Sequence, residues 1–348
     1  MPMKIVFRAD ASAEIGIGHV MRCLTLADEL ARLGGVCLFL CRELRGHMAG
    51  TIRDRGHKAL LLPDTDDLAE DAAFTRQAVE REGGTDWLVT DHYGIARDWE
   101  EAVAAVSRRI CVIGGPADRE HLCDILHDQN YFHDHEAMWR PLVPAAADLL
   151  LGPRFALLRP EFLEARKRRG MEGRNRVLVT FGGGDVPNAT ELALRALALA
   201  GFDGGADVAV GGANPHLAAL EKVASRMGNV RLHVSPRDMA SLMAEADFAI
   251  CGGGVTLFEG LCIGMPSLVV SIAANQSLAV RLLAEDGYAR FAGEARSLTV
   301  ELLAERIAAF AGADAERRAM AAKGMELVDG RGAARVAERL LGWREAGA

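Results

Sequence analysis

The sequence contains no long run of apolar residues. A membrane-spanning helix needs about eighteen consecutive apolar residues, and no stretch is that long. We therefore expect neither a transmembrane helix nor a membrane partner. The opening residues, MPMKIVFRAD, reach an acidic side chain without forming the apolar core of a signal peptide. We therefore interpret them as a buried strand and expect a cytoplasmic protein.

Two further absences narrow the class of protein. None of the seven cysteines belongs to a C-x-x-C pair, and most are flanked by Leu, Val or Ile, which predicts reduced, buried thiols. An excess of positive charge is also missing, since the formal net charge is −8. That balance disfavours a nucleic-acid partner, although it is compatible with a local cationic pocket for a phosphorylated small molecule. Because no exposed apolar stripe is evident, we expect a monomer.

What the sequence does contain is an alternation of short apolar runs with amphipathic stretches. This alternation is typical of parallel sheets with helices on both faces, and 348 residues are enough for two such α/β domains. Apolar residues at helical spacing, such as Val20, Cys23, Leu24, Ala27 and Leu30, lie between the runs. The expected strands are KIVFR, GVCLFL, HKALLL, DWLVTD and RICVIG in the first half, and RVLVTF, ADVAV, NVRLHV, DFAIC and SLVVSI in the second.

The alternation weakens in the charged stretch that ends in MEGRNR, just before a fresh strand. We place the domain boundary there, and in each domain we expect ligands beyond the carboxyl ends of the strands. The predicted organisation is a first doubly wound domain over 1–160, a linker over 161–175, a second over 176–330 and a C-terminal helix over 331–348.

Three glycine-rich turns follow expected strands: RADASAEIGIGH, FGGGD and CGGGVTLFEG. Glycine lets backbone N–H groups approach an anion, and the N-terminus of a following helix adds a favourable dipole, although tight turns also use glycine for steric reasons alone. The two turns of the second half predict a diphosphate ligand. The sequence lacks a P-loop, and GIGHVMR departs from the dinucleotide motif G-x-G-x-x-G. Glu259 can accept hydrogen bonds from a ribose diol, or it is a solvated helix residue.

His19 is the strongest catalytic candidate. It stands at the start of an expected helix, whose positive end disfavours a charge on the imidazole, and a neutral imidazole can act as a general base on water. The alternative is a histidine that only caps or packs. Asp10 and Ser12, at the end of the preceding strand, can orient His19 or bind substrate hydroxyls.

Polar residues also end other strands. Asp91, His92 and Tyr93 are well placed for a ligand in the first domain, and Asn275 and Gln276 for sugar substituents in the second. The histidine-rich stretch HLCDILHDQNYFHDHEAMW lacks the spacing of a closed metal site, so we interpret it as a polar loop.

Together these stretches resemble the UDP-2,4-diacetamido-2,4,6-trideoxy-β-L-altropyranose hydrolases of pseudaminic acid biosynthesis, which are relatives of the spore-coat polysaccharide proteins. The similarity runs along almost the whole chain, and its specific part is the opening motif R-x-D-x-S with G-x-G-H-x-x-R. It continues in VTDHYGIARDWE, VLVTFGGGD, GGGVTLFEGLCIGMPSL and VDGRGAARV. The family usually carries two aspartates where this chain has Gly114 and Gly115.

The resemblance implies a GT-B fold, in which two Rossmann-like domains face a central cleft. It also implies hydrolysis of the bond between a sugar and UDP, with inversion and with neither a metal nor another cofactor. His19 is then the catalytic residue, and a UDP-sugar is the small-molecule partner. The residues expected to bind the sugar are Asp10, Ser12, Gly18, Arg22, Tyr93, Asn275 and Gln276. Those expected to hold UDP are Gly182, Gly183, Gly184, Gly253, Gly254, Val255, Thr256 and Glu259.

Three other functions stay open at this point. A GT-B glycosyltransferase would pass the sugar to an acceptor instead of water, and an epimerase would keep the sugar linked to UDP. A non-catalytic protein that binds a sugar nucleotide is the third, and Gly114 and Gly115 favour it.

Overall fold

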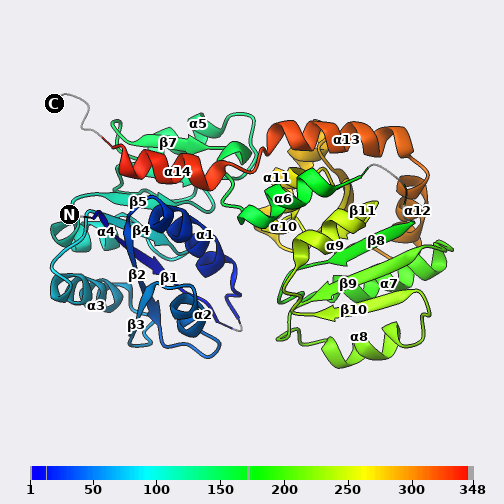
Figure 1. Ribbon diagram of the computed structural model, residues 1–348, viewed down its shortest axis with the longest axis horizontal. Coiled ribbons are helices and arrows are strands. Elements are labelled where there is room, and N and C mark those ends of the chain that lie inside the picture. Colours follow the sequence, from blue (N-terminus) through cyan, green and yellow to red (C-terminus); the bar gives the residue numbers. More distant parts are fainter. Residues whose placement is uncertain (1, 13, 171–172, 174, 344–348) are drawn as a thin grey trace. The chain divides into compact units, whose positions relative to one another are not determined.

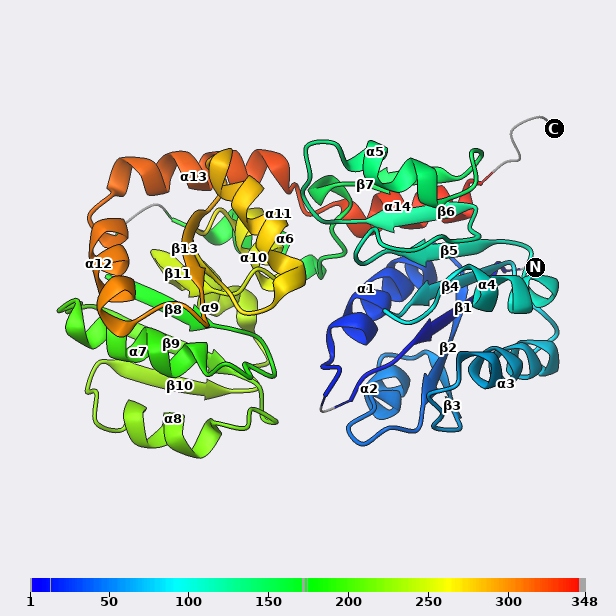
Figure 2. The same cartoon turned by 180° about the vertical axis from the view of Figure 1, so that it is seen from behind.

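The chain folds into two compact units, each built on one parallel β-sheet. The computed structural model describes residues 2–12, 14–170, 173 and 175–343. One unit comprises the residues up to Leu158 together with those from Arg331 onwards, and the other comprises Arg159–Gly330. In both units helices cover the two faces of the sheet (Figures 1 and 2).

The first unit has a seven-stranded sheet in the order β3-β2-β1-β4-β5-β6-β7, and every pairing is parallel. Its strands are β1 (Lys4–Ala9), β2 (Val36–Arg42), β3 (Lys58–Leu62), β4 (Trp87–Asp91), β5 (Ile110–Ile113), β6 (Ile125–Asp128) and β7 (Asp148–Leu151). Its helices are α1 (Gly18–Arg32), α2 (Ala49–Asp54), α3 (Leu68–Arg81), α4 (Arg97–Val103), α5 (His135–Trp139) and α14 (Gly332–Leu341).

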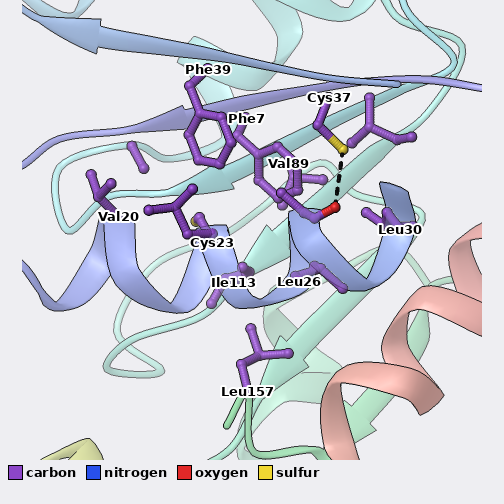
Figure 3. Packing of buried hydrophobic residues seen from close by; sticks show 14 of the residues in the cluster. Phe7, Val20, Cys23, Leu26, Leu30, Cys37, Phe39, Val89, Ile113 and Leu157 are labelled. Carbon is purple, nitrogen blue, oxygen red and sulfur yellow. Dashed lines mark hydrogen bonds between the residues drawn. The ribbon is translucent and has the colours of Figure 1, made fainter. Parts of the chain in front are cut away.

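Helix α1 covers one face of this sheet with the stripe that its sequence predicts. Val20, Cys23 and Leu30 are fully buried against Phe7 and Phe39, whose rings stack with centroids 4.8 Å apart (Figure 3). Such burial of an apolar stripe supplies most of the stability of a helix in a folded domain. Helix α1 is therefore held firmly by its core face.

Helix α14 returns to the first unit and packs beside α1 (Figure 1). Val336 and Leu340 are fully buried in the same core as α1, and the Nε1–H of Trp87 donates to the carbonyl of Leu340 at 3.0 Å. Residues distant in sequence thus complete the face of the sheet that carries α1.

The second unit has a six-stranded parallel sheet in the order β10-β9-β8-β11-β12-β13. Helices α7 and α12 pack together, whereas α10 contacts α6, α9 and α13. The strands are β8 (Arg176–Thr180), β9 (Gly205–Val210), β10 (Val230–Val234), β11 (Phe248–Cys251), β12 (Ser267–Ser271) and β13 (Arg290–Glu294). The helices are α6 (Pro160–Arg168), α7 (Ala189–Leu199), α8 (Leu217–Ala224), α9 (Met239–Glu245), α10 (Val255–Ile263), α11 (Ala274–Glu285), α12 (Val300–Ala311) and α13 (Asp314–Leu327).

All ten predicted strands are present, but three more were missed: β6, β7 and β13. The histidine-rich stretch is not a loop, because it contains β6 and α5. Residues 161–168 of the expected linker lie in α6 (Pro160–Arg168), which belongs to the second unit, and the C-terminal helix belongs to the first. All seven cysteines are buried and free, as expected. In the described part of the chain, no helix is both long and apolar enough to cross a membrane.

The topology brings the motifs of the sequence to two places. Strand order reverses between β1 and β4 in one sheet and between β8 and β11 in the other, and ligands of doubly wound sheets bind at such reversals, beyond the carboxyl ends of the strands. The turn that carries His19 follows β1, and the sequence TDHYG ends β4 and continues beyond it. FGGGD and CGGG follow β8 and β11 in the same way.

Candidate active site and nucleotide site

His19, the second residue of α1, is held by a buried carboxylate. Its Nδ1 lies 2.5 Å from Oδ1 of Asp91, the last residue of β4. Register in the sheet places Asp91 beside Ala9, so the ends of β1 and β4 bring the two side chains together. Asp91 is completely buried and His19 nearly so.

Asp91 receives two further donors from α1. The Nε and Nη2 of Arg22 donate to its two carboxylate oxygens, each at 2.5 Å, and the Cys23 thiol lies 3.6 Å from Oδ2. Burial alone raises the pKa of the Asp91 carboxyl, but the charges of Arg22 and His19 outweigh it and hold the pKa far below its ordinary value. The carboxylate is therefore ionised at neutral pH.

An ionised carboxylate against Nδ1 fixes the tautomer of the imidazole. The proton resides on Nδ1, which donates it to Asp91, and Nε2 carries the lone pair. The Tyr93 ring stands edge-on to the imidazole with centroids 4.6 Å apart, and Tyr93 is half exposed. His19 thus combines a fixed orientation with a basic nitrogen, which is the requirement for a general base.

Asp10 and Ser12 do not orient His19, contrary to one of the roles expected for them. Asp10 accepts from Arg8 and Arg42 in a buried network, and Arg8 also bonds Asp71. Burial alone raises the pKa of Asp10, but its arginine partners lower it to about 2. Ser12 Oγ accepts the backbone N–H groups of residues 14 and 15 at 3.1 and 3.0 Å, so it shapes the turn before α1.

Gly16 and Gly18, in the turn before α1, are glycine for different structural reasons. Gly16 has a φ of +82°, which side-chain-bearing residues rarely adopt, so the turn requires glycine there. Gly18 has an ordinary φ, and a Cβ added to it would meet nothing within 4 Å. Glycine at position 18 therefore leaves open space beside the N-terminus of α1, next to His19.

In the second unit, the two glycine turns lead to α7 and α10, and a side chain caps the N-terminus of α7 but not that of α10. Asp185 caps α7, because its carboxylate accepts the N–H groups of Ala189 and Thr190 at 2.8 and 2.9 Å. Helix α10 begins after Gly254 with no side-chain cap and no acidic residue in its first turn, and α11 begins after Ala273 in the same way. Free N–H groups at helix N-termini bind anions, so α10 and α11 can hold a phosphate and α7 cannot.

The glycines that precede α7 and α10 also differ in why a side chain is absent. Gly182, Gly183 and Gly184 border open space, because a Cβ on any of them would meet nothing within 4 Å. At Gly253 a Cβ would lie 2.3 Å from Val280, so packing within the unit requires that glycine. A Cβ on Gly254 would meet only Gln276, at 3.7 Å, and Val255 and Thr256 are the first residues of α10, whose N–H groups have no partner within the helix.

Gln276 and Glu259 lie close to the uncapped end of α10. Gln276 Oε1 is buried and has no hydrogen-bond partner among the described residues, so it is available to accept a hydrogen bond from a ligand. Glu259, in the second turn of α10, is not the solvated residue that the alternative interpretation expected: burial raises its pKa to about 7, with Arg159 only 3.9 Å away. Arg159 was not predicted as a site residue, because it stands at the end of the expected first domain, just before the expected linker. The side chain of Asn275 lies outside the described part of the chain.

The histidine-rich stretch has a structural explanation for three of its histidines. His121 bonds Glu100 at 2.6 Å, His127 bonds the carbonyl of Phe155 at 2.8 Å, and His135 bonds Asp128 at 2.8 Å. Among the described residues, no three His, Cys, Asp or Glu side chains gather in a group that could hold a metal ion.

Comparison with known proteins identifies relatives by sequence. No family model matches the chain. The UDP-2,4-diacetamido-2,4,6-trideoxy-beta-L-altropyranose hydrolase of Campylobacter jejuni is 27% identical over 295 residues, which are 82% of this chain and 98% of that protein. The spore coat polysaccharide biosynthesis protein SpsG of Bacillus subtilis is 31% identical over 191 residues, which are 53% of this chain and 56% of SpsG.

Comparison of structures identifies the fold. MurG of Acinetobacter baumannii superposes with a TM-score of 0.65 at 15% identity, covering 99% of this chain and 100% of MurG. The calicheamicin glycosyltransferase CalG4 gives 0.64 at 18% identity, with coverage of 99% and 100%. Anabaena HepE, solved in complex with UDP and glucose, gives 0.64 at 14% identity, with coverage of 98% and 100%. The fold is therefore the GT-B fold of two Rossmann-like domains, and the resemblance of this chain to the altropyranose hydrolase is confirmed over most of its length.

Proposed function

We propose that this protein hydrolyses a UDP-linked diacetamido-trideoxy sugar, with His19 as the general base. The observation that carries the proposal is the contact of His19 with Asp91, which leaves Nε2 as the basic nitrogen of an oriented ring. Arg22 keeps Asp91 ionised and fixed. The similarity to the Campylobacter jejuni hydrolase supports the choice of substrate.

In the proposed reaction, a water molecule attacks the anomeric carbon while Nε2 of His19 accepts one of its protons. A bond forms between the water oxygen and the anomeric carbon, and the bond from that carbon to the UDP oxygen breaks. The electron pair of the broken bond leaves with UDP. Attack from the face opposite the leaving group inverts the anomeric configuration.

Departure of UDP places negative charge on its diphosphate. The uncapped N-termini of α10 and α11 supply fixed N–H donors for that charge, and preorganised donors need little rearrangement as the charge develops. We assign the ribose to Glu259 and a sugar substituent or phosphate to Gln276. The Asp185 cap on α7 excludes that helix end from the phosphate site, although the Gly182–Gly184 turn can still border the nucleotide.

The test is incubation with UDP-2,4-diacetamido-2,4,6-trideoxy-β-L-altropyranose, followed by NMR. We expect free UDP and free sugar, and in ¹⁸O-labelled water the label enters the sugar. His19→Ala is expected to abolish turnover while UDP affinity, measured by calorimetry, stays within about twofold. Equal activity of this variant would remove His19 from the mechanism, and binding without release of UDP would contradict the hydrolase.

A glycosyltransferase is the second candidate, because the solved structures that match this fold include glycosyltransferases. In that case an acceptor hydroxyl takes the place of water at Nε2. Release of UDP only when an acceptor is added would favour this reaction over hydrolysis.

A further inference from the structure

A small cavity opens beside the residues that hold His19. It lies at the carboxyl ends of β4 and β5 and is lined by Arg22, Thr90, Tyr93, Gly114, Gly115 and Arg119, among others. The room inside is about 10 Å³ for the centre of a water-sized group, so it admits one small group. The proposed reaction as described above does not use this cavity.

Two polar side chains of the cavity have unused hydrogen-bonding capacity. The Oγ1 of Thr90 is buried and has no partner among the described residues, and Thr90 as a whole is only 2% exposed. Arg22 uses Nε and Nη2 on Asp91, whereas its Nη1 makes no hydrogen bond within the described chain. Leaving the buried Oγ1 of Thr90 without a partner is costly, and Arg22 Nη1 offers a further donor, so an occupant that accepts hydrogen bonds is favoured here.

The charges around the cavity are already balanced. Asp91 neutralises Arg22, and Asp118 pairs with Arg119, which also donates to the carbonyl of Tyr93. His121, on another wall, is paired with Glu100. A carboxylate would bring an uncompensated charge into this space, whereas a neutral carbonyl oxygen would not.

Gly114 and Gly115 define how large the occupant can be. A Cβ at Gly114 would lie 2.8 Å from the Trp139 ring, which is anchored by a 2.9 Å hydrogen bond to Asp128. A Cβ at Gly115 would lie 3.0 Å from two carbons of the Tyr93 ring. The anchored Trp139 ring therefore leaves no room for a side chain at Gly114, whereas a side chain at Gly115 would have to displace the Tyr93 ring slightly. No carboxylate projects from either position.

We infer that this cavity receives the carbonyl oxygen of one acylamino substituent of the sugar, with Arg22 and Thr90 as donors and Gly115 as the residue that limits size. The inference deepens the proposed function and rests on it for the UDP-sugar.

The test is calorimetric binding in the His19→Ala background, so that no ligand is consumed. The probes are the diacetamido UDP-sugar and two analogues, each with one acetamido group replaced by hydroxyl. We expect one analogue to bind about tenfold more weakly than the parent, because a site built for a hydrogen-bonded group rejects a ligand that lacks it.

Thr90→Val removes the hydroxyl and keeps the shape. We expect about five- to tenfold weaker binding of the parent, a smaller difference between the parent and that analogue, and an unfolding temperature that is unchanged or higher. Gly115→Ala narrows the cavity through Tyr93 and should act in the same direction. Gly50→Ala is the matched control, because a Cβ on this exposed residue of α2 meets nothing within 4 Å.

Equal binding of all three probes, or an unchanged preference in Thr90→Val, would overturn the inference. Tighter binding of an analogue with a carboxylate in place of the acetamido group would overturn it as well. Because binding is read without turnover, these outcomes bear on the cavity alone. Failure of the unaltered protein to release UDP bears on the hydrolase alone.

Discussion

The two sheets have equivalent strand reversals, yet α1, which follows β1 at the first, and α10, which follows β11 at the second, begin with different chemical groups. At the first reversal, the first turn of α1 carries His19, and Arg22 lies three residues after it; both side chains bond Asp91. At the second, α10 starts with neither a side-chain cap nor an acidic residue in its first turn. In the proposed function, the same topology thus provides a proton acceptor in one unit and an anion site in the other. Chemistry here depends on which side chains satisfy the helix end, more than on the fold.

Asp91→Asn is the most direct test of the first unit in this comparison, because it alters the contact with His19. The amide cannot hold the Nδ1 proton of His19 in place, and Arg22 becomes a buried charge without its partner. We expect kcat to fall on the order of 10³-fold and the free energy of unfolding to fall by about 3 kcal/mol, with UDP affinity unchanged. Turnover by NMR, calorimetry and denaturant unfolding measure the three quantities.

Asp71→Asn is the matched control, because Asp71 is also buried and paired with an arginine, Arg8, but does not contact His19. We expect it to lose stability and retain kcat. If the two variants lose kcat equally, Asp91 acts through stability and has no special relation to His19.

The role of the second unit in this comparison is tested by placing an acidic residue at the uncapped N-terminus of α10. Gly254→Asp caps α10 and puts a negative charge where the diphosphate is expected, so we expect UDP affinity to fall about 10- to 100-fold without loss of stability. Calorimetry with UDP measures the effect. Ala313→Asp adds the same charge at the uncapped start of α13 and should leave UDP binding intact. Similar losses in both variants would mean that overall charge, and not the α10 site, weakens binding.

The pH dependence of UDP binding sharpens the comparison, because it probes Glu259, a carboxyl of the second unit whose pKa is raised by burial although Arg159 lies 3.9 Å away. With a pKa of about 7, Glu259 is ionised above pH 7 and accepts the ribose hydroxyls, and it is protonated below. We expect UDP affinity to fall about tenfold from pH 8 to pH 6, and Glu259→Gln to remove that dependence. Parallel pH profiles for both proteins would exclude Glu259 as the titrating group.

The same pKa has a consequence for stability. Folding raises the pKa of Glu259 from 4.5 to about 7, so the folded state binds the proton more tightly than the unfolded chain does. The contribution to stability is present below pH 4.5 and is lost as the pH rises to 7. In Glu259→Gln this part of the pH dependence of unfolding should disappear.

The smallest effect is expected from the thiol that faces Asp91. Cys23→Ala removes a weak donor 3.6 Å from Oδ2, so we expect kcat to fall about two- to threefold and stability by about 1 kcal/mol. Cys37→Ala removes a buried thiol from the same core that bonds the carbonyl of Ala27 instead. It should cost similar stability and leave kcat unchanged, and a kcat loss in both would assign the effect to packing.

The sequence predicted the elements with strong periodicity and missed those without it. Helix α1 showed its buried stripe, whereas β6 is four residues long and lies in a stretch rich in His and Asp. Strand β13 contains Gly293 and a register shift against β12, so it lacks a continuous apolar run. Short strands stabilised by their neighbours carry little signal of their own.

The candidate active site was also predicted only in part from the sequence. His19 and Glu259 stood out because residue type and place along the chain suggested their chemistry. The contact of His19 with Asp91 spans 72 residues and depends on the register of β1 with β4, which no local pattern encodes. Asp10 was the nearer candidate in sequence, but Arg8 and Arg42 occupy it.

Helix α14 has a consequence for the order in which the protein is made. The core that supports α1, and with it His19, includes Val336 and Leu340, so a ribosome must translate residues 332–341 before that core can close. The second unit consists of Arg159–Gly330 without interruption and contains its own core. During synthesis, the part that is expected to bind the nucleotide can therefore mature first, and the part with the proposed base, His19, is completed only when α14 emerges.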